Sequence, residues 1–293
     1  MPHRKLYRLQ LSRRTLVLGK RTLIMGVLNV TPDSFSDGGK YFSLQKAVDG
    51  ALEMERAGAD ILDIGGESTR PGSGGTAAAE ELARVLPVIE ALRGRLKIPI
   101  SIDTQKASVA EIALGAGAEL VNDISGLKND AGLAAVAARH KAPIILMHMR
   151  GTPRTMQRAG FAKDVLKDVT AGLRESVAKA RKAGIAKSQI VLDPGIGFGK
   201  SYAQNYELIA KLANIAKLGY PLLVGTSRKG FIGATLAKGG KIKPAEERIW
   251  GTAATVAASI MNGAHIVRVH DVAEMVEVAR VTDCLIHSEL RPR

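Results

Sequence analysis

Residues 98–124, IPISIDTQKASVAEIALGAGAELVNDI, contain two short apolar runs separated by a helical pattern. The runs, 98–102 and 120–124, are rich in β-branched residues, and polar residues lie at or just after the end of each. The residues between them, 108–115, have the spacing of a short helix. Continuous apolar runs of this length are typical of strands buried on both faces of a parallel sheet. The segment therefore predicts one strand–helix–strand unit.

The same rhythm continues along the chain. Further apolar runs lie at 23–28, 61–64, 143–147, 190–192, 221–224 and 265–269, and helical patterns lie at 82–92, 133–140, 166–183, 206–218 and 245–261. Two more helices are expected, one capped by Ser43 and ending at Gly58, and one beginning at Asp271, where Glu274 completes a capping box. Eight strands alternating with helices over about 250 residues predict a TIM (β/α)8 barrel.

An open, doubly wound α/β sheet is the alternative architecture. No G-x-G-x-x-G follows the first run, and eight even units favour a closed barrel. Ahead of the first unit, residues 7–11 alternate between apolar and polar types, 12–14 suit a turn, and 15–18 suit a second strand. We expect these residues to form a β-hairpin that closes the barrel floor. No Pro/Ser-rich linker interrupts the pattern, so we expect a single domain over 1–293.

The net charge of +14 indicates an anionic partner. The densest basic patches are Arg4, Lys5, Arg8, Arg13 and Arg14 near the start, and Lys238, Lys241 and Lys243 further on. Aromatic residues make up only 4% of the chain, which leaves few platforms for stacking single-stranded nucleic acid. We therefore expect a solvated basic surface with a few cations aimed at a small anion, and neither nucleic acid nor membrane as a partner.

The cysteine content excludes a disulfide framework and any cysteine-based zinc site, because Cys284 is the one cysteine of the sequence. Its presence fits a reducing compartment, and we expect a cytoplasmic protein. The longest apolar runs fall far short of the ~20 residues that a membrane-spanning helix needs. No apolar region follows the basic start, so we expect no secretory signal.

Polar and glycine residues follow every predicted strand. In strand order they are 29–39, 65–72, 103–104, 122–123, 148–150, 193–200, 225–230 and 268–271. A TIM barrel has its active site at the carboxyl ends of its strands, so these groups are expected to meet at one rim. Each of them alone is more often a loop residue or a helix cap. All eight sets at one rim predict a ligand site.

Some motifs at this rim only approach known signatures. Residues 195–201, GIGFGKS, resemble a Walker A loop, but the first glycine lies one residue too close, so a tight backbone turn is the remaining interpretation. Lys229 at a strand end could form a Schiff base, as in barrel aldolases. His148 is equally consistent with a hydrogen-bonded residue near the core. No metal-ligand spacing such as H-E-x-x-H occurs at the rim.

The rim motifs together closely resemble the dihydropteroate synthase family, within the wider family of pterin-binding proteins. They are NVTPDSFSDGG at 29–39, GGESTRPG at 65–72, NDI at 122–124, MHM at 147–149, DPGIGFGK at 193–200, SRK at 227–229 and RVHD at 268–271. The matches run from Met25 to Val272, nearly the whole chain, and their order makes them highly specific.

The resemblance implies a reaction of folate biosynthesis. A 6-hydroxymethyl-7,8-dihydropterin diphosphate would lose pyrophosphate through a cation-like step with Mg2+, and the amine of p-aminobenzoate would join the methylene carbon. The implied catalytic residues are Asp37, Asp103, Asp193 and Lys229. The implied substrate-binding residues are Thr69, Arg70, Asp103, Asn122, Met147, Asp193, Phe198, Gly225, Ser227, Lys229, Arg268 and His270, and Asn29 is the implied metal ligand. The family also implies a homodimer and a target for sulfonamides.

The residue types suit these roles. A carboxylate can accept a pair of N–H donors from the pterin edge, and it favours positive charge developing on the ring. Arg268 and His270 would bind the diphosphate, and Asn29 would give Mg2+ an oxygen. We expect 31–39 and 66–75 to close over the diphosphate, bringing Asp37 near the metal and building an aminobenzoate pocket from Phe35, Pro71 and Phe198.

Gly230 is a possible departure from the family, because some relatives carry a hydroxyl residue at this position that helps to hold the aminobenzoate carboxylate. The runner-up function is a corrinoid-linked methyltransferase subunit that binds methyltetrahydrofolate and needs a cobalamin partner. A third hypothesis, from another class, is a non-catalytic protein that binds anions or RNA through its basic surface.

Overall fold

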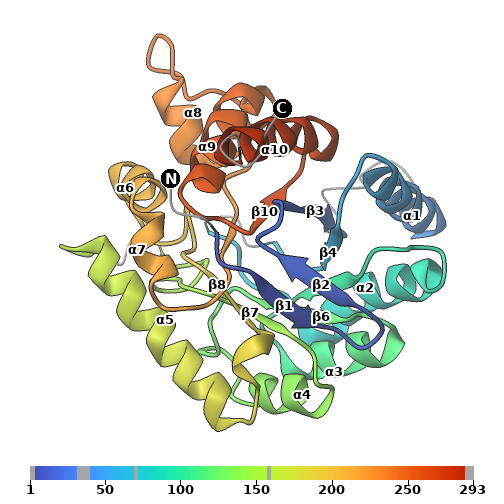
Figure 1. Cartoon of the computed structure of the whole chain (residues 1–293). Coiled ribbons are helices and arrows are strands. Elements are labelled where there is room, and N and C mark those ends of the chain that lie inside the picture. Colours follow the sequence, from blue (N-terminus) through green and yellow to red (C-terminus); the bar gives the residue numbers. More distant parts are fainter. Residues whose placement is uncertain (1–3, 32–39, 69–71, 157–159, 288–293) are drawn as a thin grey trace.

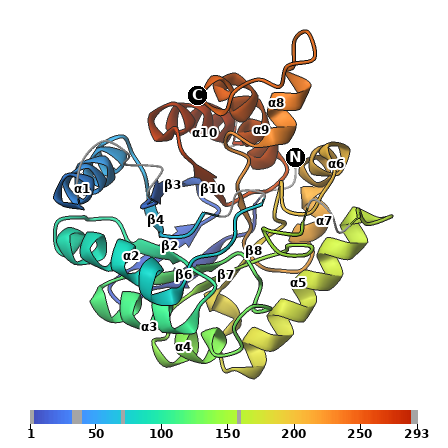
Figure 2. The same ribbon diagram turned by 180° about the vertical axis from the view of Figure 1, so that it is seen from behind.

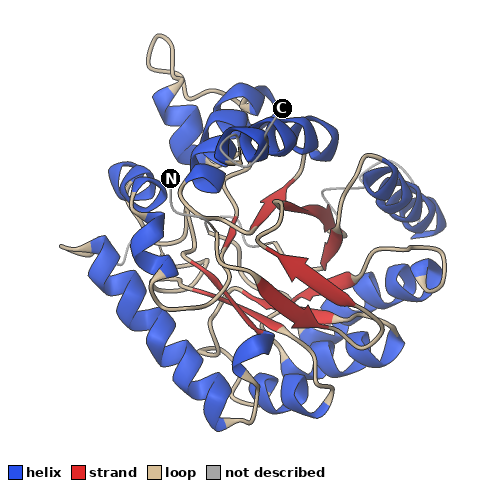
Figure 3. Cartoon of the chain, in the orientation of Figure 1, coloured by secondary structure: helices blue, strands red, loops and turns tan. Residues whose placement is uncertain are grey.

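A computed structural model describes residues 4–31, 40–68, 72–156 and 160–287. Within these ranges an eight-stranded parallel sheet has the strand order β8-β7-β6-β5-β4-β3-β10-β9. A further parallel bridge between Leu192 and Leu222 joins the two outer strands, so the sheet closes on itself. The strands lie at the centre of a ring of helices (Figures 1 and 3). The predicted TIM barrel is confirmed.

Every predicted apolar run contains a strand. The barrel strands are β3 (Leu23–Asn29), β4 (Ile61–Gly65), β5 (Ile100–Asp103), β6 (Leu120–Asp123), β7 (Ile144–Met147), β8 (Ile190–Asp193), β9 (Leu223–Val224) and β10 (Ile266–Val269). Adjacent strands place predicted site residues side by side at their carboxyl ends: Asp103 is in register with Asn122, and Met147 with Asp193.

The helices cover the outside of the barrel and bury apolar stripes against it. They are α1 (Lys40–Arg56), α2 (Ala78–Leu92), α3 (Ala107–Ala116), α4 (Leu133–Arg139), α5 (Val165–Lys182), α6 (Tyr202–Ala210), α7 (Leu212–Ala216), α8 (Gly230–Thr235), α9 (Ile249–Met261) and α10 (Val272–Ile286). Val88 and Ile89 of α2 and Leu173 of α5 are typical of the buried side chains of these stripes. No helix within the described ranges is long and apolar enough to cross a membrane.

The helix boundaries differ from the predicted ones in several places. Helix α1 begins at Lys40, ahead of the predicted cap Ser43. The single helix expected over 206–218 is two helices, α6 and α7, because Lys211 leaves the helical conformation with φ −103° and ψ 18°. Helix α8 was not predicted, since its six residues are too few to show a periodicity. Helix α9 begins at Ile249, after a short 3₁₀ turn (Ala245–Glu247).

The predicted capping box at Asp271 is wrong. Asp271 occupies the N-cap position of α10, but its side chain makes no capping hydrogen bond. Instead the carboxylate binds the guanidinium of Arg228 through both oxygens, with Nε 3.1 Å from Oδ2. A two-pronged, charge-assisted contact to arginine is stronger than a bond to a neutral backbone N–H, so it takes the carboxylate away from the helix.

The predicted hairpin closes the amino-terminal end of the barrel. Strands β1 (Tyr7–Gln10) and β2 (Thr15–Leu18) pair antiparallel and lie across the end that faces the viewer in Figure 1. Leu9, Leu11 and Leu18 are buried in one cluster with residues from the starts of the strands, among them Met25 and Leu120. Figure 2 shows the opposite end, where the strands have their carboxyl termini.

The expectation that the basic patch near the chain start is solvated is wrong for Arg4, which is only 8% exposed. Its guanidinium donates to the Thr22 hydroxyl at 2.6 Å and to the Ala264 carbonyl at 2.9 Å, and it forms an ion pair with Asp283 of α10. Arg14 is likewise paired with Glu119, at 3.1 Å. Part of the basic surplus therefore ties the beginning of the described chain to the barrel.

If the hairpin is part of the core, Leu9→Ala should lower the free energy of unfolding by about 2–5 kcal/mol, because it leaves a cavity among packed side chains. Leu9 is 1% exposed, whereas Leu6 of the same segment is 59% exposed. The matched control Leu6→Ala should therefore change stability by less than about 0.5 kcal/mol. Urea titration monitored by circular dichroism measures both variants. Equal effects would contradict a plugging role.

Candidate active site

A cavity of about 670 Å³ opens at the carboxyl ends of the strands, as the barrel predicts. The predicted site residues that line it are Asn29, Asp103, Asn122, Met147, Asp193, Phe198, Gly225, Ser227, Lys229, Arg268 and His270. The remaining predicted residues, Phe35, Asp37, Thr69, Arg70 and Pro71, lie outside the described residues. The structure thus gathers the described part of the prediction around one cavity.

A cluster of buried charges forms the floor of this cavity. Arg268 of β10 donates from Nε to Oδ2 of Asp63 at 2.6 Å and from Nη2 to Oδ2 of Asp103 at 2.7 Å. Asn122 of β6 donates to the same Asp63 oxygen at 2.9 Å. Burial disfavours the charge on Arg268, but the two carboxylates outweigh that cost and raise the pKa of the guanidinium. Strands β4, β5, β6 and β10 are thereby linked by charge-assisted bonds, across the intervening strand β3.

Asp63 is the site residue that sequence reasoning missed. It lies in the middle of β4, is fully buried, and holds both Arg268 and Asn122. Its other oxygen, Oδ1, has no hydrogen-bond partner among the described residues. The available signal was a lone carboxylate inside the otherwise apolar run 61–64, because an unpaired charge is almost never buried in a strand.

Two carboxylates of the cavity wall have perturbed acidities. Burial raises the pKa of Asp193 to about 6, although its Oδ1 accepts the backbone N–H of Gly195 at 2.7 Å. Burial also raises the pKa of Asp103, and the adjacent Arg268 opposes that shift. Buried carboxylates with few bonds of their own are suited to accept donors from a ligand.

Lys229 and Phe198 both line the cavity and contact each other. The Lys229 ammonium lies 4.1 Å from the centre of the Phe198 ring, a cation–π contact. Burial, together with the charge of Arg268, lowers the pKa of Lys229 to about 8. Lys229 precedes α8 as its N-cap residue, so the strand-to-helix turn after β9 places it. With a pKa of about 8, Lys229 is mainly a cation at neutral pH.

His270 is a neutral donor in this site. Burial and the nearby Arg268 lower the pKa of His270 to about 3. The Ser227 hydroxyl accepts the backbone N–H of His270 at 3.2 Å and lies 3.0 Å from its Nδ1. The Ser227 hydroxyl therefore fixes the orientation of the His270 ring, and the neutral imidazole keeps one N–H donor.

The Ser-Arg-Lys turn is fixed from behind. Arg228 has a φ of +58°, which is costly for a residue with a side chain. Its N–H donates to the Thr252 hydroxyl at 3.1 Å, its carbonyl accepts from Arg248 at 2.7 Å, and its guanidinium binds Asp271. Next to this turn, Gly230 lines the cavity, and no described atom lies within 4 Å of where its Cβ would be.

The chain matches the family described as pterin binding enzyme over residues 25–270. It is 52% identical over 267 residues to the dihydropteroate synthase of Synechocystis, covering 91% of each chain. The structure of Yersinia pestis dihydropteroate synthase with a sulfonamide drug is 43% identical, with a TM-score of 0.88 over 96% of this chain and 99% of that one. Xanthomonas albilineans dihydropteroate synthase with 4-aminobenzoic acid is 40% identical, with a TM-score of 0.89 over 98% and 100%. The chain therefore belongs to the pterin-binding enzyme family, among the dihydropteroate synthases, which are transferases of folate biosynthesis.

Proposed function

We propose that this cavity joins 6-hydroxymethyl-7,8-dihydropterin diphosphate to p-aminobenzoate, giving 7,8-dihydropteroate and pyrophosphate. The observation that carries the proposal is the convergence of Asp103, Asn122, Asp193, Lys229 and Arg268 on one cavity. A flat heterocycle with several ring N–H donors and one carbonyl needs that mixture of acceptors and donors. The dihydropteroate synthase of Synechocystis, which is 52% identical to this chain, points to the same reaction.

The pterin ring would bind against the carboxylate wall. The second oxygen of Asp193 accepts ring N–H donors, while Asn122 and Asp103 bind the neighbouring edge and Lys229 donates to the ring carbonyl or nitrogen. When the C–O bond to the diphosphate breaks, positive charge grows on the methylene carbon and the ring. A buried carboxylate stabilises that charge more strongly than water does, because it is already oriented.

The diphosphate would bind next to this wall, at Arg268 and His270. Arg268 presents the N–H groups that Asp63 and Asp103 do not occupy, and the neutral imidazole of His270 would supply a further contact. Met147, Gly225 and Thr69 complete the substrate contacts in this proposal. Pyrophosphate then leaves as the amine nitrogen of p-aminobenzoate forms the new C–N bond and gives up a proton.

The residues present fit a Mg2+ ion held mainly by the substrate. Asn29 lies at the exposed end of β3 and lines the cavity, where its amide offers one hard oxygen. No group of three His, Cys, Asp or Glu that could hold a metal occurs among the residues that the structure describes. Mg2+ accepts one or two protein oxygens together with water and phosphate oxygens. It would neutralise charge on the departing pyrophosphate, and Asp37 would lie near it.

The aminobenzoate would bind beside Phe198, with its amine towards the methylene carbon. Phe198 supplies an apolar face, and Phe35, Arg70 and Pro71 belong to the same proposed pocket, which loops 31–39 and 66–75 would close. Because Gly230 carries no side chain, the carboxylate would be held by backbone N–H groups, with Ser227 nearby. This assignment leaves more open space at the carboxylate end than a hydroxyl residue would.

We also propose that the protein is a cytoplasmic homodimer. Trp250 of α9 is 81% exposed, and Val281 and Leu285 of α10 are more than half exposed. Large apolar side chains exposed on neighbouring helices are a common sign of an interface. Cys284 is exposed and unpaired, which suits a reducing compartment.

The function is tested by mixing protein with pterin diphosphate, p-aminobenzoate and Mg2+. Pyrophosphate and 7,8-dihydropteroate should appear together in equal amounts, since one bond breaks as the other forms. A sulfonamide should compete with p-aminobenzoate and leave the KM for the pterin unchanged. If well-folded protein released no pyrophosphate, the proposed reaction would be wrong.

Asp193 should give pterin binding a characteristic pH dependence. Its carboxylate must be ionised to accept N–H donors, so affinity should fall as the pH drops through about 6. Asp193→Asn should lower turnover on the order of 10²-fold, the usual loss for one such electrostatic contact. In Asp193→Asn the neighbouring Asp103 still titrates, so the pterin affinity of the variant should depend on pH, but less steeply than that of the wild type. Calorimetry at several pH values measures the affinity for the pterin, with the exposed Asp49→Asn as the control. If the affinity of the wild-type protein did not change between pH 5 and 8, the proposed role of Asp193 would be wrong.

If the exposed apolar residues of α9 and α10 form the dimer interface, a charged substitution there should lower the mass of the assembly in solution. Trp250→Glu should shift the protein towards the monomer in sedimentation velocity, because a charge cannot be buried there without a partner. Ile112→Glu is the matched control, since Ile112 is also exposed but lies on α3. A wild-type protein that sediments as a monomer at all concentrations would rule out the homodimer.

A further inference from the structure

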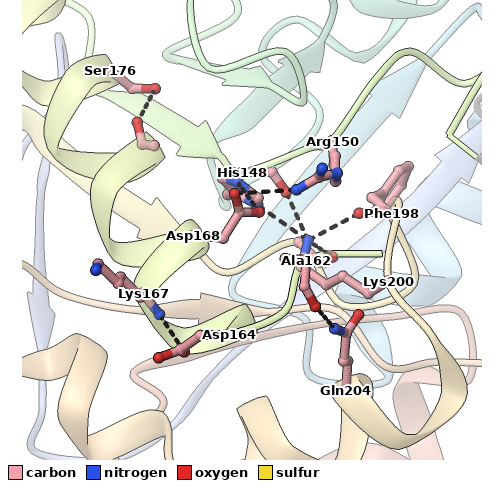
Figure 4. A network of polar contacts seen from close by, with 12 residues as sticks. His148, Arg150, Ala162, Asp164, Lys167, Asp168, Ser176, Phe198, Lys200 and Gln204 are labelled. Atoms are coloured by element: carbon pink, nitrogen blue, oxygen red, sulfur yellow. Dashed lines mark hydrogen bonds and ion pairs between the residues drawn. The ribbon is translucent and has the colours of Figure 1, made fainter. Parts of the chain in front are cut away.

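Lys200 is a buried cation to which the proposed chemistry gives no part. It ends the loop that follows β8 and is only 5% exposed. Its ammonium donates to the carbonyl oxygens of Gly195 at 2.8 Å, Phe198 at 2.9 Å and His148 at 3.2 Å (Figure 4). His148 Nδ1 lies at 3.2 Å as a fourth acceptor. The ammonium is therefore held by backbone carbonyls, although Lys200 also lines the wall of the substrate cavity.

Three glycines give the loop this shape. Gly195, Gly197 and Gly199 all have positive φ, at +68°, +86° and +66°. A Cβ on Gly195 would overlap the carbonyl oxygen of His148, and one on Gly199 would collide with that of Arg150. The loop can thus lie directly against the segment after β7 only with glycine at these positions. Its carbonyls then converge on one point, which the Lys200 ammonium occupies.

The other side of the same loop faces the substrate cavity. The Gly195 N–H donates to Asp193 at 2.7 Å, and the Phe198 ring lies beneath the Lys229 ammonium. The Gly197 N–H donates to the Asn205 side chain at 2.6 Å, which ties the loop to α6. The backbone carbonyls of this short loop therefore bind Lys200, while its Gly195 N–H and Phe198 side chain contact active-site residues.

A second layer of charge supports the ammonium. Since Lys200 donates to Nδ1 of His148, the imidazole proton lies on Nε2, 3.5 Å from a carboxylate oxygen of Asp168 on α5. Arg150 approaches the same carboxylate at 3.4 Å. Burial and Lys200 lower the pKa of His148 to about 3, and burial lowers that of Lys200 to about 7. Both pKa values fall because burial away from water disfavours the charged form of each group.

We propose that Lys200 is a positioning residue for the second substrate: its ammonium fixes the 195–199 loop, so that Phe198 faces Lys229 in the pocket that receives p-aminobenzoate. The inference rests on the proposed function. Asp193 has independent support because it belongs to β8, whose backbone is paired with β7. Phe198 lies in the loop itself and has no such support, so the aminobenzoate site depends more strongly on Lys200 than the pterin site does.

The test is steady-state kinetics of Lys200→Met, which keeps the length and removes the donors. The KM for p-aminobenzoate should rise about tenfold, the effect of one disturbed contact, while kcat changes by less than about threefold. The KM for the pterin diphosphate should change less. Lys200→Gln retains two N–H donors, so its KM should lie between those of the wild type and Lys200→Met.

Arg4→Met is the matched control, because Arg4 is also a buried cation bound to a backbone carbonyl, at the other end of the barrel. It should lower the unfolding temperature and leave both KM values unchanged. If Lys200→Met behaved in the same way, Lys200 would be merely structural and the inference would be wrong. A wild-type protein that makes no dihydropteroate would instead contradict the proposed function.

Chemical labelling of the wild-type protein keeps the inference testable if the variants do not fold. Acetic anhydride should acetylate Lys200 only when the 195–199 loop opens. Pterin together with a sulfonamide should slow that acetylation by about tenfold, since occupancy of the pocket favours the closed loop. The exposed Lys182 should react at one rate throughout. Unchanged labelling of Lys200 on ligand binding would overturn the proposal.

Discussion

The bond between Arg268 and the carboxylates of Asp63 and Asp103 is the constraint on which the rest of the site depends. A lone ion in a barrel interior costs several kcal/mol, and pairing offsets this only where the geometry is good. Here one guanidinium donates to two carboxylates on neighbouring strands, and Asn122 donates to the same oxygen of Asp63. Removing a single member would leave a buried charge unpaired, so the group holds together as a unit. The floor of the cavity is polar and already oriented before any ligand arrives, which is the condition for electrostatic catalysis.

The barrel separates this polar end from an apolar one. Leu9, Leu11 and Leu18 of the hairpin fill the amino-terminal end together with side chains from the strand starts. Only a few residues further along the same strands, charged groups replace the leucines and isoleucines. Every kcal/mol that the polar end costs can be offset by dense apolar packing at the other end and beneath the helices, because all of them unfold with the same sheet. A fold of this kind can therefore hold strained or charged residues, such as Arg228 in its left-handed conformation, without losing its shape.

Sequence periodicity was sufficient for the parts of the molecule in which local pattern and burial agree. The eight strands, the hairpin and the gathering of polar residues at one rim all follow from apolar runs that end in polar residues. The pattern failed where a distant charge competes with a local preference. Asp271 follows the rule for a helix cap, yet Arg228, 43 residues away in sequence, takes its carboxylate. Asp63 is a carboxylate inside an otherwise apolar strand, and its presence there is explained only by its bond to Arg268, which lies near the other end of the chain. Such partners are far apart in the sequence and meet only when the barrel closes, so no local stretch of sequence predicts the contact.

The loop after β8 shows the same limit at the scale of a single motif. Its spacing of glycines and lysine resembles a loop that binds phosphate, in which backbone N–H groups converge on an anion. In this chain the carbonyls converge instead, and the ion that they surround is the lysine of the motif itself. Gly195 and Gly199 allow the loop to lie directly against the segment after β7, where a Cβ would meet the carbonyl oxygens of His148 and Arg150. Glycine spacing therefore predicts that a tight turn forms, whereas the neighbours of the turn decide which charge it holds.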